Sequence, residues 1–459
     1  MTGRLFGTTG VRKVYGREFD VEMALRLGKA FGTYLGGGTV LLARDARTTG
    51  LAIESALAAG ILSTGVNVVR AGMIPTPTLA FVTRLYGLSA GVMVTASHNP
   101  PEYTGVKFWQ GDSMGYPPEE ERKIEGIYNS GEFRIAPWNA LGAESTLHTA
   151  PEDHMREILS RTNVAEIERR KFKVVVDPGN GAASVLTPYL VRRLGCDVVS
   201  LNSQPDGHFP GRPSEPDEST LGGLVDTVRS TGADLGVAHD GDSDRVVFVT
   251  EKGEVVRGDR IIALLAREML RTAGGGTIVT TVDSSRVLDE TVEKAGGQTV
   301  RTPVGDIQVA LKVKETGALM GGEACGVFIF PEFHLAPEPF LAVCRILELM
   351  ARSENSLGEL VATIPVYPLL KSKVPCANED KERVMSRLAE VAPSELGDVQ
   401  DVLTVDGLGL MLPDGWVLIR PSGTEPVVRV TCEAMSESRV SAVMEQATAL
   451  VKDVVDGVR

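Results

Sequence analysis

Three segments of the chain share one order of features: an apolar run, an acidic residue, and small residues that lead into a helical pattern. The apolar runs end at Asp45, Asp177 and Asp283, which lie far apart in the sequence. Short β-branched runs that are flanked by turn residues and alternate with helices are typical of βα units with largely parallel, buried strands. The pattern therefore predicts three similar α/β domains in tandem.

The last part of the chain has a different pattern. From about residue 370 it predicts a charged helix over 379–391, short strands over 416–419 and 427–432, and a closing amphipathic helix, which together are typical of a smaller α+β domain. The length of 459 residues is enough for about three domains, with two to four allowed. A charged segment over 152–170 is expected to be a helix near the first joint. The expected domains cover residues 1–150, 151–253, 254–367 and 368–459.

Composition excludes several classes of protein. The net charge of −13 argues against a dedicated nucleic-acid binder, which usually carries a basic face. The five cysteines are far apart and none forms a CxxC pair, so neither a disulfide framework nor a zinc site is indicated. The sequence contains no apolar run long enough for a membrane span, and its start lacks the apolar stretch of a signal peptide. We therefore expect a cytoplasmic protein that binds neither nucleic acid nor membrane.

A serine stands at the end of a predicted strand over 91–94. It is Ser97, in the sequence T-A-S-H-N-P-P over 95–101, where two prolines prevent an immediate helix. Ligands of open α/β sheets gather at such strand ends, and a hydroxyl there can be a nucleophile or carry a phosphate. The alternative is a turn serine that bonds its own backbone beside a packed His98.

Three aspartates follow another predicted strand, over 234–238, in the sequence D-G-D-S-D-R over 240–245. Carboxylates at alternate positions of an extended loop can converge on one Mg²⁺ ion, which prefers oxygen ligands. An EF-hand calcium loop is the competing interpretation, and Glu251 fits its twelfth position. Arg245 occupies the sixth position, where the sharp turn needs glycine, so that interpretation fails. A solvated acidic turn remains the simple alternative.

A third loop, R-P-S-G-T-E-P over 420–426, lies between two strand-like runs. Its small residues offer backbone N–H groups and hydroxyls in one concavity, and Arg420 adds a forked cation, with Arg429 on the following strand. Such nests hold phosphate. An ordinary Ser-Gly hairpin turn is the alternative.

Weaker signals come from three further places. Glu323, framed by glycines in G-G-E-A-C-G over 321–326, can accept from two vicinal sugar hydroxyls or can be a buried carboxylate paired with arginine. Arg12, which ends a small-residue loop, and Lys107 can each sit against a phosphoryl group or be ordinary surface cations.

Together and in this order, these segments resemble the α-D-phosphohexomutase superfamily, which contains the phosphoglucomutases, phosphomannomutases and phosphoglucosamine mutases. The resemblance covers essentially the whole chain. It implies an α/β fold with three tandem α/β/α domains built on mixed sheets. A smaller C-terminal α+β domain that resembles the TATA-binding-protein fold would follow, and the four domains would surround a central cleft.

The resemblance also implies a role for each loop. Ser97 would carry a phosphoryl group beside a Mg²⁺ ion, and a bisphosphate intermediate would return its second phosphate to the serine. A hexose phosphate would be the partner, and the protein would be a monomer or small homo-oligomer. By position, the metal ligands would be Ser97, Asp240, Asp242 and Asp244. The reaction centre would include Arg12, His98, Lys107 and Arg245, and the substrate-binding residues would be Glu323, Cys325, Arg420, Ser422, Gly423, Thr424 and Arg429.

The positions at which this sequence departs from the family pattern bear on which sugar is preferred, and not on the class of reaction. Cys325 stands where serine is common and Val327 where many members have histidine, and Thr104 and Lys13 also differ. The sequence looks most like archaeal phosphoglucosamine-mutase-type members. Phosphomannomutase or dual phosphomannomutase/phosphoglucomutase activity is the nearest alternative. A metal-dependent sugar phosphatase and a catalytically silent sugar-phosphate-binding protein are more distant ones.

Overall fold

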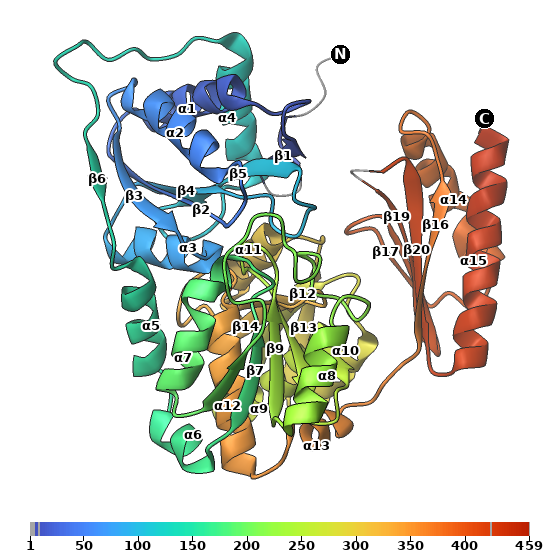
Figure 1. Ribbon diagram of the computed structural model, residues 1–459. Coiled ribbons are helices and arrows are strands. Elements are labelled where there is room, and N and C mark those ends of the chain that lie inside the picture. The colour runs from blue at the N-terminus through green and yellow to red at the C-terminus, as the bar shows by residue number, and fades with distance from the viewer. Residues whose placement is uncertain (1–4, 8–9, 423–424, 459) are drawn as a thin grey trace. The chain divides into compact units, whose positions relative to one another are not determined.

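The computed structural model describes residues 5–7, 10–422 and 425–458 (Figure 1). The chain forms two compact units. The first unit contains the residues up to Ile261 together with Cys325–Thr363, and the second contains Ile262–Ala324 and the residues from Ile364 onward. The chain therefore passes from one unit to the other at 261/262, 324/325 and 363/364.

The first sheet, in the N-terminal part of the first unit, has six strands in the order β1-β5-β4-β2-β3-β6. Strands β4, β2, β3 and β6 are parallel, whereas β5 and β1 pair antiparallel to their neighbours. Figure 1 shows α1, α2 and α4 on one face of this sheet and α3 on the other. The elements are β1 (Val11–Val14), α1 (Val21–Leu35), β2 (Thr39–Arg44), α2 (Gly50–Leu62), β3 (Asn67–Met73), α3 (Thr76–Leu85), β4 (Ala90–Val94), β5 (Tyr103–Gln110), α4 (Pro118–Ser130) and β6 (Glu144–Thr146).

The second sheet, also in the first unit, has five strands in the order β11-β10-β9-β7-β8. Strands β8, β7 and β9 are parallel, and β10 and β11 are antiparallel additions. The elements are α5 (Ala150–Ser160), α6 (Val164–Arg170), β7 (Lys173–Asp177), a 3₁₀ turn (Ala182–Val185), α7 (Thr187–Arg193), β8 (Asp197–Ser200), α8 (Gly222–Thr231), β9 (Leu235–His239), β10 (Val246–Thr250) and β11 (Val255–Val256).

The third sheet has the order β13-β12-β14-β15, with β13, β12 and β14 parallel. Its elements are α9 (Gly258–Ala273), β12 (Gly276–Thr281), α10 (Arg286–Lys294), β13 (Gly297–Thr302), α11 (Asp306–Thr316), β14 (Met320–Glu323), β15 (Val327–Ile329), α12 (Pro339–Ser353) and α13 (Leu357–Ala362).

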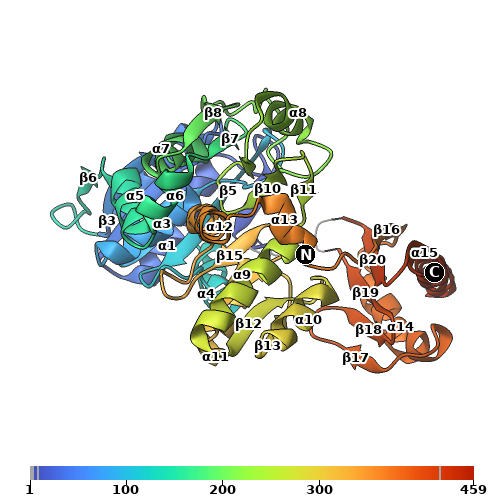
Figure 2. The same cartoon turned by 90° about the horizontal axis from the view of Figure 1, so that it is seen from below.

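The fourth sheet is antiparallel, in the order β16-β20-β19-β18-β17, and lies in the second unit. Helices α14 and α15 cover one of its faces, and Figure 2 shows the long α15 beside β16 and β20. The elements are β16 (Leu369–Pro375), α14 (Lys381–Glu395), β17 (Asp401–Leu403), β18 (Leu408–Leu412), β19 (Gly415–Pro421), β20 (Val427–Ala434) and α15 (Glu437–Val458).

The cores of these layers follow from the sequence pattern. The valines at 174–176 of β7 and the run at 40–43 of β2 are fully buried, because central parallel strands are covered on both faces. The predicted fold class, three α/β domains followed by a smaller α+β domain, is confirmed. None of the helices in the described ranges is long and apolar enough to span a membrane.

One predicted element is wrong. The segment 152–170, expected to be a single helix, forms the two helices α5 and α6. The break has a local cause, because the Asn163 side chain accepts a hydrogen bond from the Glu166 N–H and so caps the start of a new helix.

Candidate active site

Ser97 lies just beyond the carboxyl end of β4, in a loop held in an uncommon conformation. Its φ is 50°, a value that residues other than glycine adopt only when the surroundings impose it. The Ser97 N–H donates to Thr95 Oγ1 at 2.8 Å, and the side-chain oxygen donates to Asp240 Oδ2 at 2.9 Å. Ser97 is 1% exposed. Its hydroxyl therefore bonds a carboxylate from another element, which the turn-serine alternative does not provide for.

Arg47 holds this loop through its guanidinium, and sequence reasoning missed it. Its guanidinium donates to the backbone carbonyls of Ser97, Asn99, Pro100 and Tyr103. It also pairs with Asp45 at 3.1 Å, and Asp45 in turn accepts from Thr95 Oγ1. One signal in the sequence could have identified Arg47. It is the Asp-x-Arg spacing of Asp45 and Arg47 at the end of a buried strand, because such a pair lies against the neighbouring loop.

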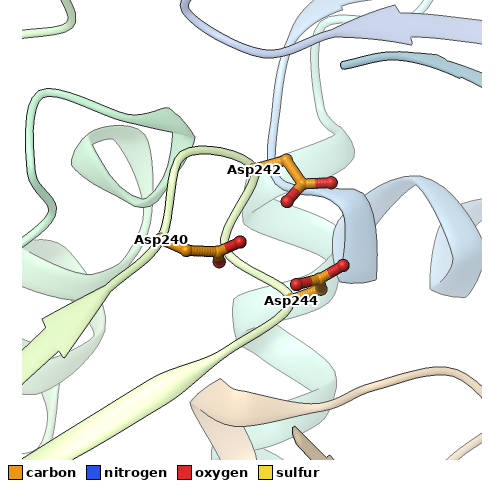
Figure 3. A group of neighbouring side chains, drawn as sticks. All are labelled: Asp240, Asp242 and Asp244. Carbon is orange, nitrogen blue, oxygen red and sulfur yellow. The ribbon is translucent and has the colours of Figure 1, made fainter. Parts of the chain in front are cut away.

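The loop between β9 and β10 brings the three aspartates together (Figure 3). One oxygen from each of Asp240, Asp242 and Asp244 lies within 4.8 Å of the others. All three residues are buried, which rules out the solvated acidic turn. Gly241 lets the loop approach the serine, because a Cβ there would lie 2.7 Å from the Ser97 carbonyl oxygen.

Lys107 and Thr76 orient two of these carboxylates. The Lys107 Nζ donates to Asp242 Oδ2 at 2.8 Å and to Asp244 Oδ2 at 2.6 Å. Thr76, at the start of α3, donates its hydroxyl to the same oxygen of Asp242 at 2.7 Å and its backbone N–H to the Asp242 carbonyl. Thr76 gave no signal in the sequence, because its partner lies far along the chain.

The remaining carboxylate oxygens fit a cation. Asp242 Oδ1 and Asp244 Oδ1 are buried and make no hydrogen bond within the described residues, although a buried acceptor normally has a partner. The donor set contains only oxygen, which suits a hard divalent ion such as Mg²⁺. The three aspartates therefore fit a metal ion beside Ser97 Oγ.

The electrostatics of this cluster reflect its burial. Burial and repulsion by Asp244 and Asp242 raise the pKa of Asp240 well above its usual value. Burial also acts to raise the pKa of Asp242, but the Lys107 ammonium outweighs it and holds that pKa below the usual value. Burial and the nearby cations Arg245 and Arg12 lower the pKa of His98 to about 2, so its imidazole is neutral at physiological pH.

Two arginines, Arg12 and Arg245, lie near Ser97 and the three aspartates. Arg12 on β1 pairs with Gly105 on β5 and so shares a sheet face with Lys107, two residues further along. Its Nε is buried and makes no hydrogen bond within the described part of the chain. Arg245 donates its backbone N–H to Asp240 and its guanidinium to both oxygens of Glu215. Sequence reasoning also missed Glu215.

The two predicted sugar-loop residues fall in different units. Glu323 ends β14 in the second unit, is 6% exposed, and accepts the Gly305 N–H at 2.8 Å. Cys325 is exposed and lies in the first unit, close enough to Arg245 to interact with its charge.

The predicted phosphate loop joins β19 to β20 in the second unit. It is a hairpin connection, as its simple alternative proposed, but its strands carry an unusual row of charge. Arg420 stands opposite Arg429, and Arg429 stands opposite Lys373 of β16. Like charges directly opposite one another destabilise a sheet, so this row is favourable where an anion binds. Lys373 was not predicted, and Gly423 and Thr424 lie outside the described residues.

Acidic side chains pair with these cations in the structure. Arg420 contacts Asp406 at 2.7 Å, and Glu425 accepts from both Arg429 and Lys373. Lys381, at the start of α14, donates to the carbonyls of Ser422 and Glu425 and so ties the loop to the helix.

Four family models together match almost the whole chain. They describe the three alpha/beta/alpha domains I, II and III and the C-terminal domain of phosphoglucomutase/phosphomannomutase, and they match residues 3–135, 152–253, 257–367 and 372–450.

Individual relatives agree with these matches. The chain is 45% identical to the probable phosphoglucosamine mutase of Methanopyrus kandleri over all of both chains. It is 40% identical to a phosphoglucomutase/phosphomannomutase of Thermococcus kodakarensis, over 99% of this chain and 100% of that protein. A phosphoglucomutase/phosphomannomutase family protein from Burkholderia thailandensis is similar in structure, with a TM-score of 0.88, 29% identity, and coverage of 98% of this chain and 97% of that one. The chain belongs to the phosphoglucomutase/phosphomannomutase family.

Proposed function

We propose that this protein is a phosphohexomutase that interconverts the 6-phosphate and the 1-phosphate of a hexose through phosphorylated Ser97. The observation that carries the proposal is the buried Ser97 hydroxyl, 2.9 Å from the nearest carboxylate of the three-aspartate loop. Phosphoryl transfer requires positioning and charge stabilisation more than covalent chemistry, and this cluster supplies both.

The proposed reaction has two matched transfers. In the first, the P–O bond to Ser97 Oγ breaks and a new P–O bond forms to the free hydroxyl of the bound hexose phosphate. The sugar hydroxyl gives up its proton to a base, for which Lys107 Nζ in its deprotonated form is the candidate, and Ser97 Oγ takes up a proton. The Arg12 guanidinium would keep its charge and donate to the transferring phosphoryl group. The hexose bisphosphate then turns over and returns its other phosphoryl group to Ser97 by the reverse chemistry.

The chain's residues divide the work. Asp240, Asp242 and Asp244 would hold Mg²⁺, which would withdraw charge from the phosphoryl group. Lys107 fixes two of these carboxylates, and Arg245 and the neutral His98 would donate to phosphoryl oxygens. Glu323 and Cys325 would meet sugar hydroxyls. The non-reacting phosphate would bind Arg420, Ser422, Gly423, Thr424 and Arg429.

Glucosamine 6-phosphate is the proposed substrate. Its support is the 45% identity, over the full length, to a protein named probable phosphoglucosamine mutase. Mannose or glucose 6-phosphate is the second candidate, supported by the Thermococcus kodakarensis relative at 40% identity.

Phosphorus NMR of the purified protein with Mg²⁺ tests this function. Glucosamine, mannose and glucose 6-phosphates are offered separately, each with a trace of the matching bisphosphate, and Ser97→Ala is the control. We expect conversion to a 1-phosphate, fastest with glucosamine 6-phosphate and absent in the variant. Free phosphate as the main product would favour a phosphatase, and binding without turnover would favour a silent sugar-phosphate-binding protein.

A further inference from the structure

Asp406 belongs to none of the predicted loops, yet it bonds one proposed substrate contact, Arg420, and the backbone of Val304, the neighbour of a residue that bonds another. It lies between β17 and β18 in the second unit. One oxygen, Oδ2, accepts the Val304 N–H at 3.0 Å and lies 2.7 Å from Arg420 NH2. A single carboxylate oxygen therefore bonds both the residue before Gly305 and the proposed phosphate-binding arginine.

The next backbone N–H, that of Gly305, bonds the proposed sugar contact Glu323. Gly305 donates to Glu323 Oε1 at 2.8 Å. Its φ is 136°, which glycine adopts without the steric cost that other residues incur. Two consecutive backbone N–H groups thus bond two carboxylates, those of Asp406 and Glu323. The phosphate contact and the sugar contact are joined through two adjacent peptide units.

Apolar packing holds the same segment in place. Val304 packs against a cluster formed by Val282, Trp416 and Leu418. Trp416 and Leu418 lie on β19, the strand that carries Arg420. The Trp416 Nε1–H and the Arg286 N–H both donate to Glu433 Oε1, which adds a second polar link between β19, β20 and the start of α10. The segment at 304–305 and the strand of Arg420 therefore share a packed interface.

Arg420 keeps donors for a ligand in this arrangement. Its NH2 is directed to Asp406, whereas the side chain as a whole remains 25% exposed. A guanidinium offers five donors in a fixed plane, so fixing one nitrogen sets the direction of the others. Asp406 can orient Arg420 without occupying all of its donors.

We propose that Asp406 is a positioning residue that sets the spacing between the phosphate-binding Arg420 and the sugar-binding Glu323. Its effect is specific for a ligand that contacts both, which is a hexose phosphate. Inorganic phosphate would bind the phosphate contacts without reaching Glu323, so it gains nothing from that spacing. The inference rests on the proposed function for the identity of the two contacts.

The test compares Asp406→Asn with a matched control, Asp414→Asn. Asp414 also pairs with an arginine in the same domain, Arg439 at 2.9 Å, but touches no proposed substrate contact. Asparagine at 406 keeps an acceptor for the Val304 N–H and removes the charge that holds Arg420. For each variant and the wild type, we would measure KM and kcat for the preferred hexose 6-phosphate and the inhibition constant of inorganic phosphate.

We expect Asp406→Asn to raise KM about tenfold with kcat nearly unchanged, which is the signature of lost uniform binding. The inhibition constant of inorganic phosphate should stay the same or fall, because Arg420 loses its internal counter-ion. The Asp414→Asn control should leave all three values unchanged. Unchanged KM in Asp406→Asn would overturn the proposal, and so would a parallel loss of hexose phosphate and inorganic phosphate binding, which indicates a general structural role.

Failure of the proposed function would show itself separately. If the wild type has no mutase activity, dissociation constants from calorimetry replace KM, with the same hexose 6-phosphate and inorganic phosphate as probes. A selective loss of hexose phosphate affinity in Asp406→Asn would still support the positioning role. Equal affinities in wild type and variant would contradict it.

Discussion

The proposed reaction centre in the first unit and the row of cations on β16, β19 and β20 in the second differ sharply in how they hold charge. In the first unit, Ser97, Lys107 and the three aspartates are almost completely buried, and each is bonded to another element. In the second unit, the side chains of Arg429 and Lys373 are 47% and 57% exposed and pair with an exposed Glu425. Charges act strongly on one another away from water and weakly beside it.

This difference matches the proposed division of work. A reacting phosphoryl group needs fixed, desolvated charges at its transition state. A phosphate that is only held must be released when the bisphosphate turns over, and exposed cations allow that. We therefore expect substitutions in the first unit to affect chemistry and folding strongly. Substitutions in the second unit should mainly affect substrate affinity.

The largest effect is expected at Asp242. Asp242→Asn removes one of the proposed metal ligands and a partner of Lys107. Loss of metal stabilisation is worth about 4 kcal/mol, so turnover should fall about a thousandfold. Thermal unfolding with and without Mg²⁺ checks the cause, because the wild type should gain stability from Mg²⁺ and the variant should gain little. Wild-type turnover in the variant would contradict the claim that the buried charges of the first unit carry the chemistry.

Arg47 gives the next largest effect, on stability. Arg47→Met leaves Asp45 buried without its cation. It also removes the guanidinium N–H groups that donate to the carbonyls of the Ser97 loop. Removing one partner of a buried pair costs about 3–5 kcal/mol, which denaturant unfolding would measure. A loss below about 1 kcal/mol would mean that the loop is held by other contacts.

Acid should also act on the first unit. Glu338 Oε2 lies 2.9 Å from His154 Nε2 and 2.8 Å from His334 Nε2, and all three residues are buried. Burial lowers the pKa of His334. Burial acts to raise the pKa of Glu338, but the two histidines outweigh it and lower that pKa to about 2.

Both shifts have the same sign for stability. His334 starts to destabilise the fold as pH drops below the usual histidine value of 6.5, and Glu338 does so below 4.5. In each case the unfolded chain binds the proton more readily, so stability is lost as pH falls, by up to about 1.4 kcal/mol per pH unit for one proton. Denaturant unfolding from pH 7 to 5 should show this slope, and His334→Asn should flatten it. An equal slope in the variant would assign the acid sensitivity to other groups.

The smallest effect on stability is expected at Arg429. Arg429→Met breaks an exposed pair with Glu425, which contributes less than about 1 kcal/mol to folding. KM for the hexose phosphate should nevertheless rise, because the variant loses a phosphate-binding cation. Comparing Arg429→Met with Arg47→Met sharpens the contrast between the two units. Equal destabilisation by the two substitutions would remove it.

Local pattern predicted much of the architecture and of the site. Apolar runs ending at Asp45 and Asp177 predicted buried strands, and D-G-D-S-D-R predicted a carboxylate cluster because alternate residues of an extended loop point the same way. The break between α5 and α6 was missed because Asn163 can either continue a helix or cap one.

The residues that position the site were harder to predict. Arg47, Thr76, Glu215 and Asp406 act through partners on other elements, and Thr76 bonds a residue 166 positions away. Only the fold brings such pairs together. Arg420, Arg429 and Lys373 form a row only because the strand register places them opposite one another.

The central claim is that Ser97 carries a phosphoryl group that moves to the substrate. Intact-protein mass spectrometry tests it directly on the purified protein with Mg²⁺, first treated with a hexose 1,6-bisphosphate and then with a large excess of the preferred hexose 6-phosphate under rapid quench. We predict a gain of one phosphoryl mass at Ser97, its transfer to the added sugar, and no gain in Ser97→Ala. A protein that turns over hexose phosphate while Ser97 is never phosphorylated would contradict the account.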